Sequence, residues 1–541
     1  MSVYLGLDSS TQSLSAIAIN LESGEKLLDV SIGFDKRLPQ FGTENGVLPN
    51  DDPNVVHSDP LVWLAALDLL FAELKEQEFD FSAVKAISGS GQQHGSVYLN
   101  SKAAAALKGL TASRRLDKQL QPALARKTSP IWMDSSSTEE CDAIEAAIGS
   151  KAAVAGLTGS SCFERFTGPQ IKKFADSDAT RYSKTAKIHL VSSFMASVMT
   201  GKHAPIDHGD GSGMNLMDIT KKDWSDHMVK ATASGLKSKL PKLVASDTDI
   251  GRISKYFVNK YGFKTNTRVI AWTGDNPCSL IGVGLIKPGR ACISLGTSDT
   301  LFGAMPTPKI SKEGEGHVFG SPTGDYMSLI CFLNGSLARE HIKGQFNIEW
   351  DEFSEILASS KPGNNGKILL PYYSPEITPH VTNAKPIRYG LDTSDLRGKV
   401  RGVIEAQMAS MAIHSKWMGV RTSAIYATGG ASANREILQV MADMNNVSVY
   451  QSQLGNTAAL GAALRAAHGH LKGTKGELPW DEVIKGFAEP VKKSIVKPDK
   501  EAVKIYRRFR QLYQACEEHT LNGGEDPSPA LKEFSRELRG K

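Results

Sequence analysis

The chain has 541 residues, which is long for one ordinary domain and suits two large lobes. Hydrophobic residues make up 40% and charged residues 22%, a composition that excludes a mainly disordered chain. The 63 Lys and Arg residues outnumber the 58 Asp and Glu residues, for a formal charge of +5. No long basic run concentrates this excess, so we expect no nucleic-acid partner.

Cysteine usage and hydropathy give expectations about the compartment. The six cysteines are scattered and none lies in a C-x-x-C pair, so neither a zinc site nor a disulfide framework is indicated, and a reducing compartment fits best. No apolar stretch reaches 18 residues, which argues against a membrane partner. The chain enters a strand directly after Met1, without a basic and apolar leader. We therefore expect a cytoplasmic protein; a peroxisomal or plastid address in a longer precursor stays open.

The first half of the chain alternates strand and helix patterns. Residues 3–7 and 14–19 predict a hairpin with a polar turn, and residues 83–87 and 96–99 predict a second strand pair around the loop 89–95. Apolar residues at helical spacing predict a helix over 61–74. Two Pro-, Asp-, Lys- and Ser-rich segments, 34–60 and 102–130, are interpreted as surface insertions. This alternation predicts an α/β lobe.

A second beginning follows the turn cluster 287–290, after which 291–295 again starts a strand, a polar turn and a strand. The later pattern predicts helices over 400–418, 434–444 and 456–468, strands over 424–428 and 447–451, and a charged helical tail from about 498 to 523. The repeated opening predicts two lobes, 1–285 and 286–541.

Two turns have the composition of phosphate-binding loops. Asp8 ends the first strand and is followed by small hydroxyl residues, whose backbone N–H groups can form an anion-binding concavity. The segment 294–300 repeats this chemistry, so the two turns could hold one phosphate chain from opposite lobes. Asp8 would then face Mg²⁺ through water. The alternative is that both are ordinary polar hairpin turns, with Asp8 bonding to its own turn.

Asp275 follows the apolar strand 269–272 and is a candidate general base, since a hydroxyl nucleophile loses its proton during phosphoryl transfer. The alternative is an ordinary Asp-Asn-Pro turn. Gly429 and Gly430 join a strand to a helix that Asn434 can cap, where a nucleoside could approach the backbone. Here the alternative is a plain strand-to-helix connection.

Neutral and cationic donors in two further loops are of the kind that bind sugar hydroxyls and a carbonyl oxygen. They lie in the segments 92–95, which contains His94, and 164–168, which contains Arg165. Arg165 could instead pair with a carboxylate for structural reasons. Trp132 could wall a sugar pocket or belong to the core. Each motif alone also fits a structural role, so it is their occurrence together, in this order along the chain, that indicates a function.

Read in order, these strings resemble the FGGY family of carbohydrate kinases, and most closely its eukaryotic members that act on D-xylulose. The matching strings are Gly6-Leu7-Asp8, Gly91-Gln92-Gln93-His94-Gly95-Ser96, Trp132-Met133-Asp134-Ser135-Ser136, Glu164-Arg165-Phe166-Thr167-Gly168, Asp210-Gly211-Ser212-Gly213-Met214-Asn215-Leu216, Gly274-Asp275-Asn276-Pro277, Ser294-Leu295-Gly296-Thr297-Ser298-Asp299-Thr300 and Ala427-Thr428-Gly429-Gly430-Ala431-Ser432. They run from Gly6 to about Gly469, most of the chain.

The resemblance implies the actin and hexokinase-like ATPase fold: two ribonuclease-H-like α/β domains around a central cleft, with sugar deep in the cleft and ATP mainly on the second lobe. It also implies the site residues: His94, Arg165, Asp275 and Asn276 for the sugar; Thr11, Gln12 and Thr297 for the phosphates of ATP; Gly429, Gly430, Asn434 and Trp350 for its nucleoside; and Asp8 for Mg²⁺.

The implied reaction is ATP-dependent phosphorylation of D-xylulose to D-xylulose 5-phosphate, with Asp275 accepting the proton of the 5-hydroxyl. Two departures limit the transfer of contacts. The first turn reads Ser10-Thr11-Gln12 where the family often has Gly-Thr-Thr, and Ser136 stands where bacterial members tend to carry arginine.

Three rival functions stay open. One is a kinase of the same family for ribulose, a deoxy-sugar or glycerol. Another is a nucleotide-driven binding module, disfavoured because residues 498–541 are too few and too charged for a peptide-binding domain. The third is an inactive sugar sensor, weakened by Asp8 and Asp275 in the expected contexts. The oligomeric state is left open.

Overall fold

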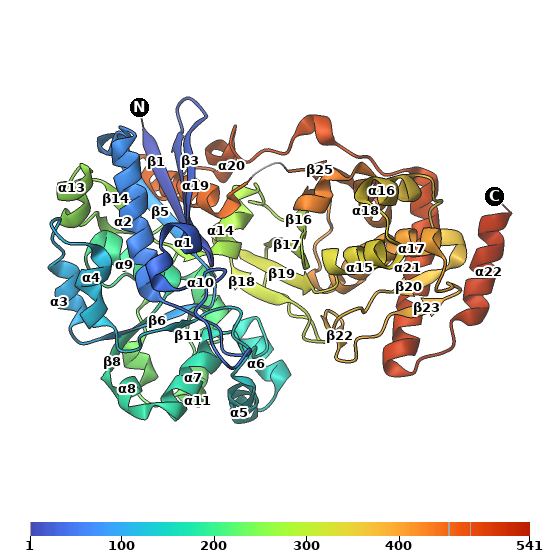
Figure 1. Ribbon diagram of the computed structural model, residues 1–541, viewed down its shortest axis with the longest axis horizontal. Coiled ribbons are helices and arrows are strands. Elements are labelled where there is room, and N and C mark those ends of the chain that lie inside the picture. Colours follow the sequence, from blue (N-terminus) through green and yellow to red (C-terminus); the bar gives the residue numbers. More distant parts are fainter. Residues whose placement is uncertain (1, 453–454, 477, 541) are drawn as a thin grey trace.

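The computed structural model describes residues 2–452, 455–476 and 478–540. It has two lobes side by side, each built on one large sheet with helices packed against it (Figure 1). The first sheet has the order β13-β14-β5-β1-β2-β3, with β15 beside β5, and the second has the order β18-β19-β17-β16-β24-β25.

The elements of the first half are β1 (Val3–Ser9), β2 (Ser13–Asn20), β3 (Glu25–Gly33), α1 (Phe34–Arg37), β4 (His57–Ser58), α2 (Pro60–Glu76), β5 (Val84–Gly91), β6 (Ser96–Asn100), α3 (Ala103–Lys108), α4 (Leu116–Leu120), β7 (Ser129–Pro130), α5 (Thr138–Ile148), α6 (Lys151–Thr158), α7 (Thr167–Ser177), α8 (Ala179–Lys184), β8 (Thr185–Leu190), α9 (Val191–Thr200), β9 (Ile206–Asp207), α10 (His208–Gly211), β10 (Met217–Asp218), β11 (Asp223–Trp224), α11 (Asp226–Thr232), α12 (Leu236–Lys239), β12 (Leu243–Val244), β13 (Asp249–Arg252), α13 (Lys255–Tyr261), β14 (Arg268–Ile270), β15 (Thr273–Gly274) and α14 (Asp275–Gly282).

The elements of the second half are β16 (Arg290–Leu295), β17 (Asp299–Met305), β18 (His317–Gly320), β19 (Tyr326–Phe332), α15 (Ser336–Phe346), α16 (Trp350–Ala358), β20 (Ile368–Leu370), β21 (Glu376–Ile377), β22 (His380–Val381), β23 (Ile387–Tyr389), α17 (Leu396–His414), β24 (Ala424–Thr428), α18 (Arg435–Asn445), β25 (Ser448–Gln451), α19 (Thr457–Lys475), α20 (Trp480–Ile484), α21 (Lys500–Asn522) and α22 (Ser528–Arg539).

The two large sheets share one topology. In the first, β1, β2 and β3 are antiparallel neighbours, and β5 and β14 continue from β1 as parallel strands. In the second, β16, β17 and β19 are antiparallel neighbours, and β24 and β25 continue from β16 as parallel strands. This is the ribonuclease-H-like arrangement that the family resemblance implied, and it occurs twice.

The predicted hairpins at 3–19 and after 291 are confirmed as β1–β2 and β16–β17. The second strand pair of the first half was predicted wrongly. Strand β5 forms, but its proposed partner β6 pairs with β8 in a separate two-stranded sheet. The reason is that β1 occupies one edge of β5 while β14 and β15 occupy the other, so β5 has no free edge for a hairpin partner.

Helix α19 crosses back from the second half of the chain onto the first sheet, where it lies beside β1 in Figure 1. The approach is very close: a Cβ atom built on Gly6 would lie 2.1 Å from the carbonyl oxygen of Ala459 and 2.2 Å from the amide nitrogen of Ala463. Gly461 meets Cys278 of α14 in the same way. Glycine and alanine on both sides permit this packing, because larger side chains would hold the backbones apart.

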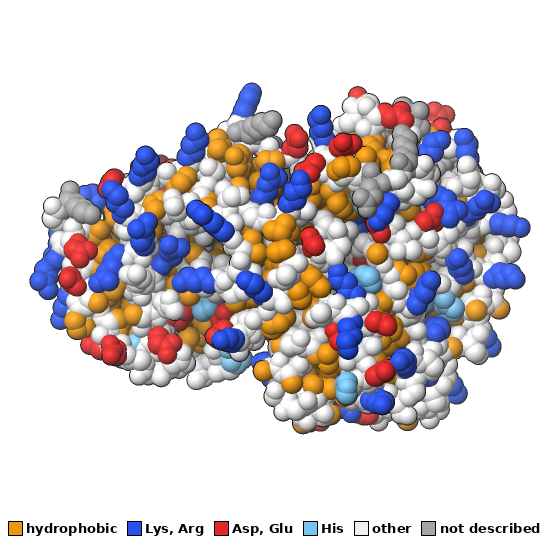
Figure 2. Space-filling view, turned by 180° about the vertical axis from the view of Figure 1, so that it is seen from behind, with side chains coloured by type: hydrophobic (Ala, Val, Ile, Leu, Met, Phe, Trp, Pro, Cys, Tyr) orange, Lys and Arg blue, Asp and Glu red, His pale blue; other side chains and the backbone are white. Residues whose placement is uncertain are grey.

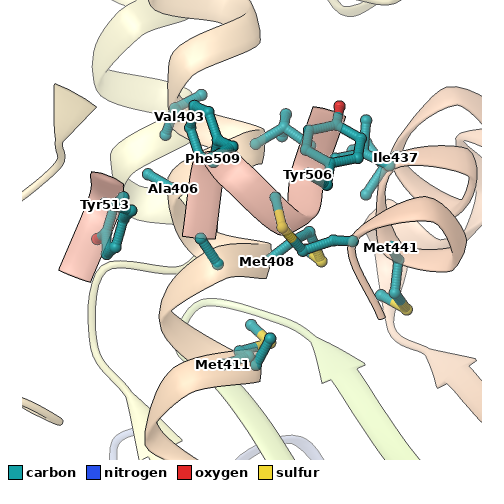
Figure 3. Close-up of a cluster of buried hydrophobic side chains, with 14 of the residues drawn as sticks. Val403, Ala406, Met408, Met411, Ile437, Met441, Tyr506, Phe509 and Tyr513 are labelled. Carbon is teal, nitrogen blue, oxygen red and sulfur yellow. The ribbon is translucent and has the colours of Figure 1, made fainter. Parts of the chain in front are cut away.

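The core of the second lobe lies between α17, α18 and α21 (Figure 3). Met408 and Met411 of α17 and Met441 of α18 are buried there, together with Tyr506 and Phe509 of α21. The predicted helical tail is therefore confirmed as α21, and its apolar face is a part of the core. It ends at Gly523 in the left-handed conformation that favours glycine at a helix terminus.

The surface charges and the helices are relevant to binding of nucleic acid and of membranes, respectively. On the face shown in Figure 2, Lys and Arg side chains are spread among acidic and apolar ones. Within the three described ranges of the chain, no helix combines the length and the apolar character needed to cross a membrane.

Candidate active site

The carboxylates Asp8 and Asp275 come together where three neighbouring parallel strands end. Asp8 is in register with Ser90 of β5, and Ser90 is in register with Thr273 of β15. Asp275 begins α14 directly after β15. Because the carboxyl ends of parallel strands lie at one edge of a sheet, the topology gathers these side chains at a single place.

Asp275, the candidate general base, has a carboxyl group with a shifted pKa. Burial, and secondly the negative charge of Asp8, raise the pKa of Asp275 to about 7. Backbone N–H groups of Asn276 (2.8 Å) and Gln93 (3.3 Å) donate to its Oδ1 and oppose this shift. A carboxylate with a pKa near neutrality can accept a proton at physiological pH and yet be ionised beforehand in a large fraction of the molecules.

Asp8 is tied to the neighbouring strand rather than to its own turn. The hydroxyl of Ser90 donates to Asp8 Oδ1 over 2.7 Å. Burial raises the pKa of Asp8 to about 6, and the Ser90 hydrogen bond opposes that shift. Within the described residues no group of three or more acidic, histidine or cysteine side chains could hold a metal alone. A single carboxylate still fits Mg²⁺, which typically binds through one or two carboxylates, substrate phosphates and waters.

The loop after Asp8 is linked to Trp132. The hydroxyl of Thr11 donates to Gln92 Oε1 (3.1 Å) and accepts from the indole N–H of Trp132 (2.8 Å). Trp132 is 45% exposed, so its interpretation as a core residue was wrong. Gln12 is exposed at the tip of the turn.

His94 lies on an aromatic ring next to Arg165. Its imidazole stacks on Phe166 with 4.2 Å between ring centroids. Its Nδ1 lies 2.7 Å from the carbonyl oxygen of Gly213, which can only accept, so Nδ1 carries the hydrogen and Nε2 is an acceptor. Burial, then the charge of Arg165, lower the pKa of His94 to about 3, so the ring is neutral. Arg165 lies over the ring of Phe163, 5.0 Å from its centroid.

Gln93 links His94 to the other two predicted sugar ligands of this region, Asp275 and Asn276. Its side-chain oxygen accepts from Asn276 Nδ2 over 2.9 Å, and its backbone N–H donates to Asp275. His94 is the next residue along the chain. Sequence reasoning noted Gln93 only as part of a motif. Its bridging position follows from β5 and β15 ending side by side.

A cavity of about 730 Å³ opens in the second lobe. It is lined by Leu295, Gly296, Thr297, Ser336, Arg339, Glu340, Trp350, Asp351, Phe353, Ser354, Gly430, Ala431, Ala433, Asn434, Arg435, Glu436 and Ile437. The structure thus brings Thr297, Trp350, Gly430 and Asn434 around one space, although they come from three separate segments. Trp350 is 44% exposed, which leaves its ring available to a ligand.

Two residues fix the backbone beside this cavity: Asn434 lines it, whereas Gly429 lies outside the lining, next to Gly430. Gly429 has a φ of +85°, and a Cβ atom on it would lie 2.4 Å from the carbonyl oxygen of Leu295, so only glycine fits there. Asn434 caps α18 as predicted: its side chain accepts from the backbone N–H groups of Glu436 and Ile437. Its Nδ2 also donates to Ser354 of α16 over 2.7 Å, which ties the two helices of the wall together.

Sequence reasoning missed a buried ion pair behind the second phosphate turn. Arg339 of α15 is 1% exposed and donates to both carboxylate oxygens of Asp299, at 3.0 and 3.2 Å. Burial raises the pKa of Asp299, and the charge of Arg339 opposes that shift. Arg339 also donates to Gln407 of α17 (2.8 Å). In the sequence, this pair could have been noticed from Arg339, a charged residue on the face of α15 that also carries the buried Ala338 and Ile342.

Two sheets that share a five-strand core, with a pair of carboxyl groups of raised pKa at the strand ends of one and a cavity at the strand ends of the other, define a two-lobed α/β kinase. The N-terminal domain model of the FGGY family of carbohydrate kinases matches residues 3–282, and the C-terminal domain model matches residues 291–470. The chain belongs to the FGGY family of carbohydrate kinases.

Curated relatives match almost the whole chain. The xylulose kinase of Rattus norvegicus is 41% identical over 534 residues, covering 97% of this chain and 98% of that protein. Xylulose kinase 2 of Arabidopsis thaliana is 42% identical over 511 residues, covering 90% and 91%.

Solved structures share the fold at lower identity. The xylulose kinase from Rhodospirillum rubrum has a TM-score of 0.80 at 18% identity and covers 96% of this chain and 99% of that one. Plasmodium falciparum glycerol kinase with ADP has a TM-score of 0.79, also at 18% identity, and covers 96% and 98%. The fold is therefore shared by a xylulose kinase and a glycerol kinase, so it does not by itself identify the substrate.

Proposed function

We propose that the protein transfers the γ-phosphoryl group of ATP to the 5-hydroxyl of D-xylulose and releases D-xylulose 5-phosphate. The observation that carries the chemistry is Asp275, whose pKa of about 7 results from burial beside Asp8 at the edge shared by three parallel strands. The choice of D-xylulose is supported by the 41% identity to the rat xylulose kinase over 97% of this chain.

Asp275 acts as the general base. As the 5-hydroxyl oxygen attacks the γ-phosphorus, its proton passes to a carboxylate oxygen of Asp275, and the bond from phosphorus to the β,γ-bridging oxygen breaks. The N–H groups of Gln93 and Asn276 hold Oδ1 in place. Positioning and charge stabilisation dominate phosphoryl transfer, so one well-placed carboxylate can suffice.

The sugar is held by donors and acceptors of fixed character. Nε2 of neutral His94 accepts from a sugar hydroxyl, since its Nδ1–H is already engaged with Gly213. Arg165 can only donate, and it suits a carbonyl or hydroxyl oxygen of the ketose. Asn276, next to the base, offers an amide that can both donate and accept.

ATP occupies the cavity of the second lobe. Its base lies at the ring of Trp350, its ribose near Gly430 and Asn434, and its phosphates extend past Thr297 toward Thr11 and Gln12 of the other lobe. Support comes from the shared lining of one cavity by Thr297, Trp350, Gly430 and Asn434. Gly429 keeps the turn in the one conformation that opens it.

Asp8 would hold Mg²⁺ through water, since this ion keeps several waters when one or two carboxylates bind it. When bound, the ion neutralises charge on the phosphates. The chain's own contribution is to keep Asp8 oriented through Ser90.

The proposed function also includes a division of the chain into two lobes and a compartment. The sugar lobe spans 1–285 and the ATP lobe 286–541, with α19 passing back onto the sheet of the sugar lobe. The six cysteines are unpaired, which is compatible with a reducing compartment such as the cytoplasm.

The test is a coupled assay of ADP release with Mg-ATP and a panel of D-xylulose, D-ribulose, L-xylulose, glycerol and no sugar. We expect turnover of D-xylulose far above the rest, and its loss in Asp275→Ala. Preference for another sugar would overturn the proposed substrate while keeping the kinase chemistry. ATP hydrolysis that no sugar accelerates would overturn both and favour a nucleotide-driven binding module.

A further inference from the structure

The proposed sugar ligand Arg165 is hydrogen-bonded across the junction between the lobes. Its Nη2 lies 2.9 Å from Nε2 of His317, the first residue of β18 in the second sheet. Sequence reasoning assigned no role to His317. The side chain is buried, with 3% of its surface exposed.

The direction of this hydrogen bond follows from chemistry. A guanidinium group has no acceptor, so Nε2 of His317 accepts the hydrogen from Arg165. The hydrogen of the imidazole is then on Nδ1, which donates to the hydroxyl of Ser160 over 3.2 Å. Burial, then the charges of Arg165 and His94, hold the pKa of His317 well below its usual range, in agreement with a neutral ring. Arg165 therefore fixes the tautomer of His317, and the Ser160 hydroxyl, which can accept, is compatible with it.

His317 and His94 also share an aromatic partner. The ring of Phe166 lies 4.2 Å from that of His94 and 5.2 Å from that of His317, between centroids. Phe163 meets His317 edge-on at 4.7 Å, and it is also the ring over which Arg165 lies. Two of the four proposed sugar ligands are therefore linked to His317: Arg165 directly, and His94 through the ring of Phe166.

Strand β18 is docked onto the first lobe at the position of His317. The N–H of Val318 donates to the carbonyl of Gly159 over 2.9 Å, and the N–H of Gly320 donates to the hydroxyl of Ser212 over 3.0 Å. A Cβ atom on Gly159 would lie 2.4 Å from the Val318 carbonyl oxygen, so the two backbones are in direct contact. His317 therefore meets Arg165 from a fixed backbone.

We propose that His317 is a positioning residue for the sugar site: it holds the guanidinium of Arg165 in the orientation that meets the sugar, so that sugar binding depends on a residue of the nucleotide lobe. The inference rests on the proposed function, because it takes Arg165 as a sugar ligand. Without the acceptor, the half-buried guanidinium loses its hydrogen-bond partner in the second lobe and is free to turn away from the sugar.

The test compares three variants with the wild-type enzyme in steady-state kinetics, with sugar and ATP varied separately. His317→Phe keeps a flat ring for Phe163 and Phe166 but removes the acceptor. His317→Gln removes the ring but restores an acceptor oxygen for Arg165 and a donor for Ser160. His380→Phe, an exposed histidine of the same lobe, is the matched control.

For His317→Phe we expect the KM for the sugar to rise about 10-fold, which corresponds to about 1.4 kcal/mol, with kcat and the KM for ATP nearly unchanged. His317→Gln should recover most of the loss, and His380→Phe should behave as the wild type. A sugar KM that is unchanged in His317→Phe would overturn the proposal. So would equal losses in His317→Phe and His317→Gln that follow a lower melting temperature, because only a structural role predicts those.

The sugar used is the one that the wild-type enzyme prefers in the substrate panel. If that sugar is not D-xylulose, the proposed substrate is wrong, and the His317 comparison is made with the sugar found. The two proposals can therefore fail separately.

Discussion

The two sheets share a core of five strands in the same order, yet the carboxyl groups at their strand ends have different hydrogen-bond partners. At the edge of the first sheet, Asp8 and Asp275 lie near each other, and the hydrogen bonds they accept come from Ser90, Gln93 and Asn276. At the edge of the second sheet, Asp299 is held by Arg339 inside the protein.

The difference shows how one topology serves two tasks. Burial raises the pKa of all three carboxyl groups, so the difference lies in their partners. Asp8 and Asp275 accept hydrogen bonds only from neutral groups, and pKa values of about 6 and about 7 allow them to exchange protons near neutral pH. Asp299 receives two hydrogen bonds from the buried guanidinium of Arg339, which ties its carboxylate to a cation. The neighbouring glycines then leave room for a ligand. Strand order sets where a side chain lies, and the charge beside it sets what it can do.

The largest expected effect comes from removing the charge of the base. Asp275→Asn should lower kcat/KM by about 10²–10⁴-fold, the usual contribution of a general base. Its melting temperature should equal or exceed that of the wild type, because the substitution removes a buried negative charge near Asp8. Kinetics and thermal unfolding of the same sample measure both. An active Asp275→Asn enzyme would contradict the assignment.

Breaking the Arg339–Asp299 ion pair of the second lobe should lower the free energy of unfolding rather than the rate of the reaction. Arg339→Leu leaves Asp299 buried without its cation, and removing one partner of such a pair costs about 3–5 kcal/mol. Urea unfolding measures the loss. Adding Asp299→Asn to Arg339→Leu should recover part of it, since the uncompensated charge is then gone. Equal stability of wild type and Arg339→Leu would show that the pair is not needed.

Two glycines of the second lobe provide a matched test of backbone conformation. Gly429→Ala forces a Cβ atom to within 2.4 Å of the Leu295 carbonyl oxygen at a φ of +85°, a strain of about 1–3 kcal/mol. Gly344→Ala, at an exposed position of α15, meets no atom within 4 Å. We expect the KM for ATP to rise several-fold in Gly429→Ala, and to change little in Gly344→Ala. An unchanged KM for ATP in Gly429→Ala would show that this turn does not shape the nucleotide site.

The pH dependence of the rate should follow the ionisation of Asp275. Because Asp275 must be ionised to accept the proton, kcat/KM should rise with pH through about 7 and then level off. Below that value the fall should approach tenfold per pH unit. A pH–rate profile with saturating ATP measures it. A flat profile between pH 5.5 and 8, values chosen to bracket about one unit either side of the expected pKa, would contradict a raised pKa of the base.

Local patterns were sufficient where partners lie close along the chain. The hairpins that begin at Val3 and Arg290 form because alternating apolar residues flank short polar turns, and α17, α18 and α21 form from helical periodicity. The cap at Asn434 was likewise readable from its position before a helix. The site residues were found through the order of their motifs, since each motif by itself also fits an ordinary turn.

What the sequence by itself determined was therefore the elements, the repeated lobe and the candidates for chemistry. Tertiary structure alone decided that β6 pairs with β8, that α19 packs on the first sheet, and that His317 meets Arg165. The physical reason is the same in each case. A free strand edge, a close helix approach or a hydrogen bond between residues more than 150 positions apart depends on which surfaces the folded chain leaves available, and no local pattern records that.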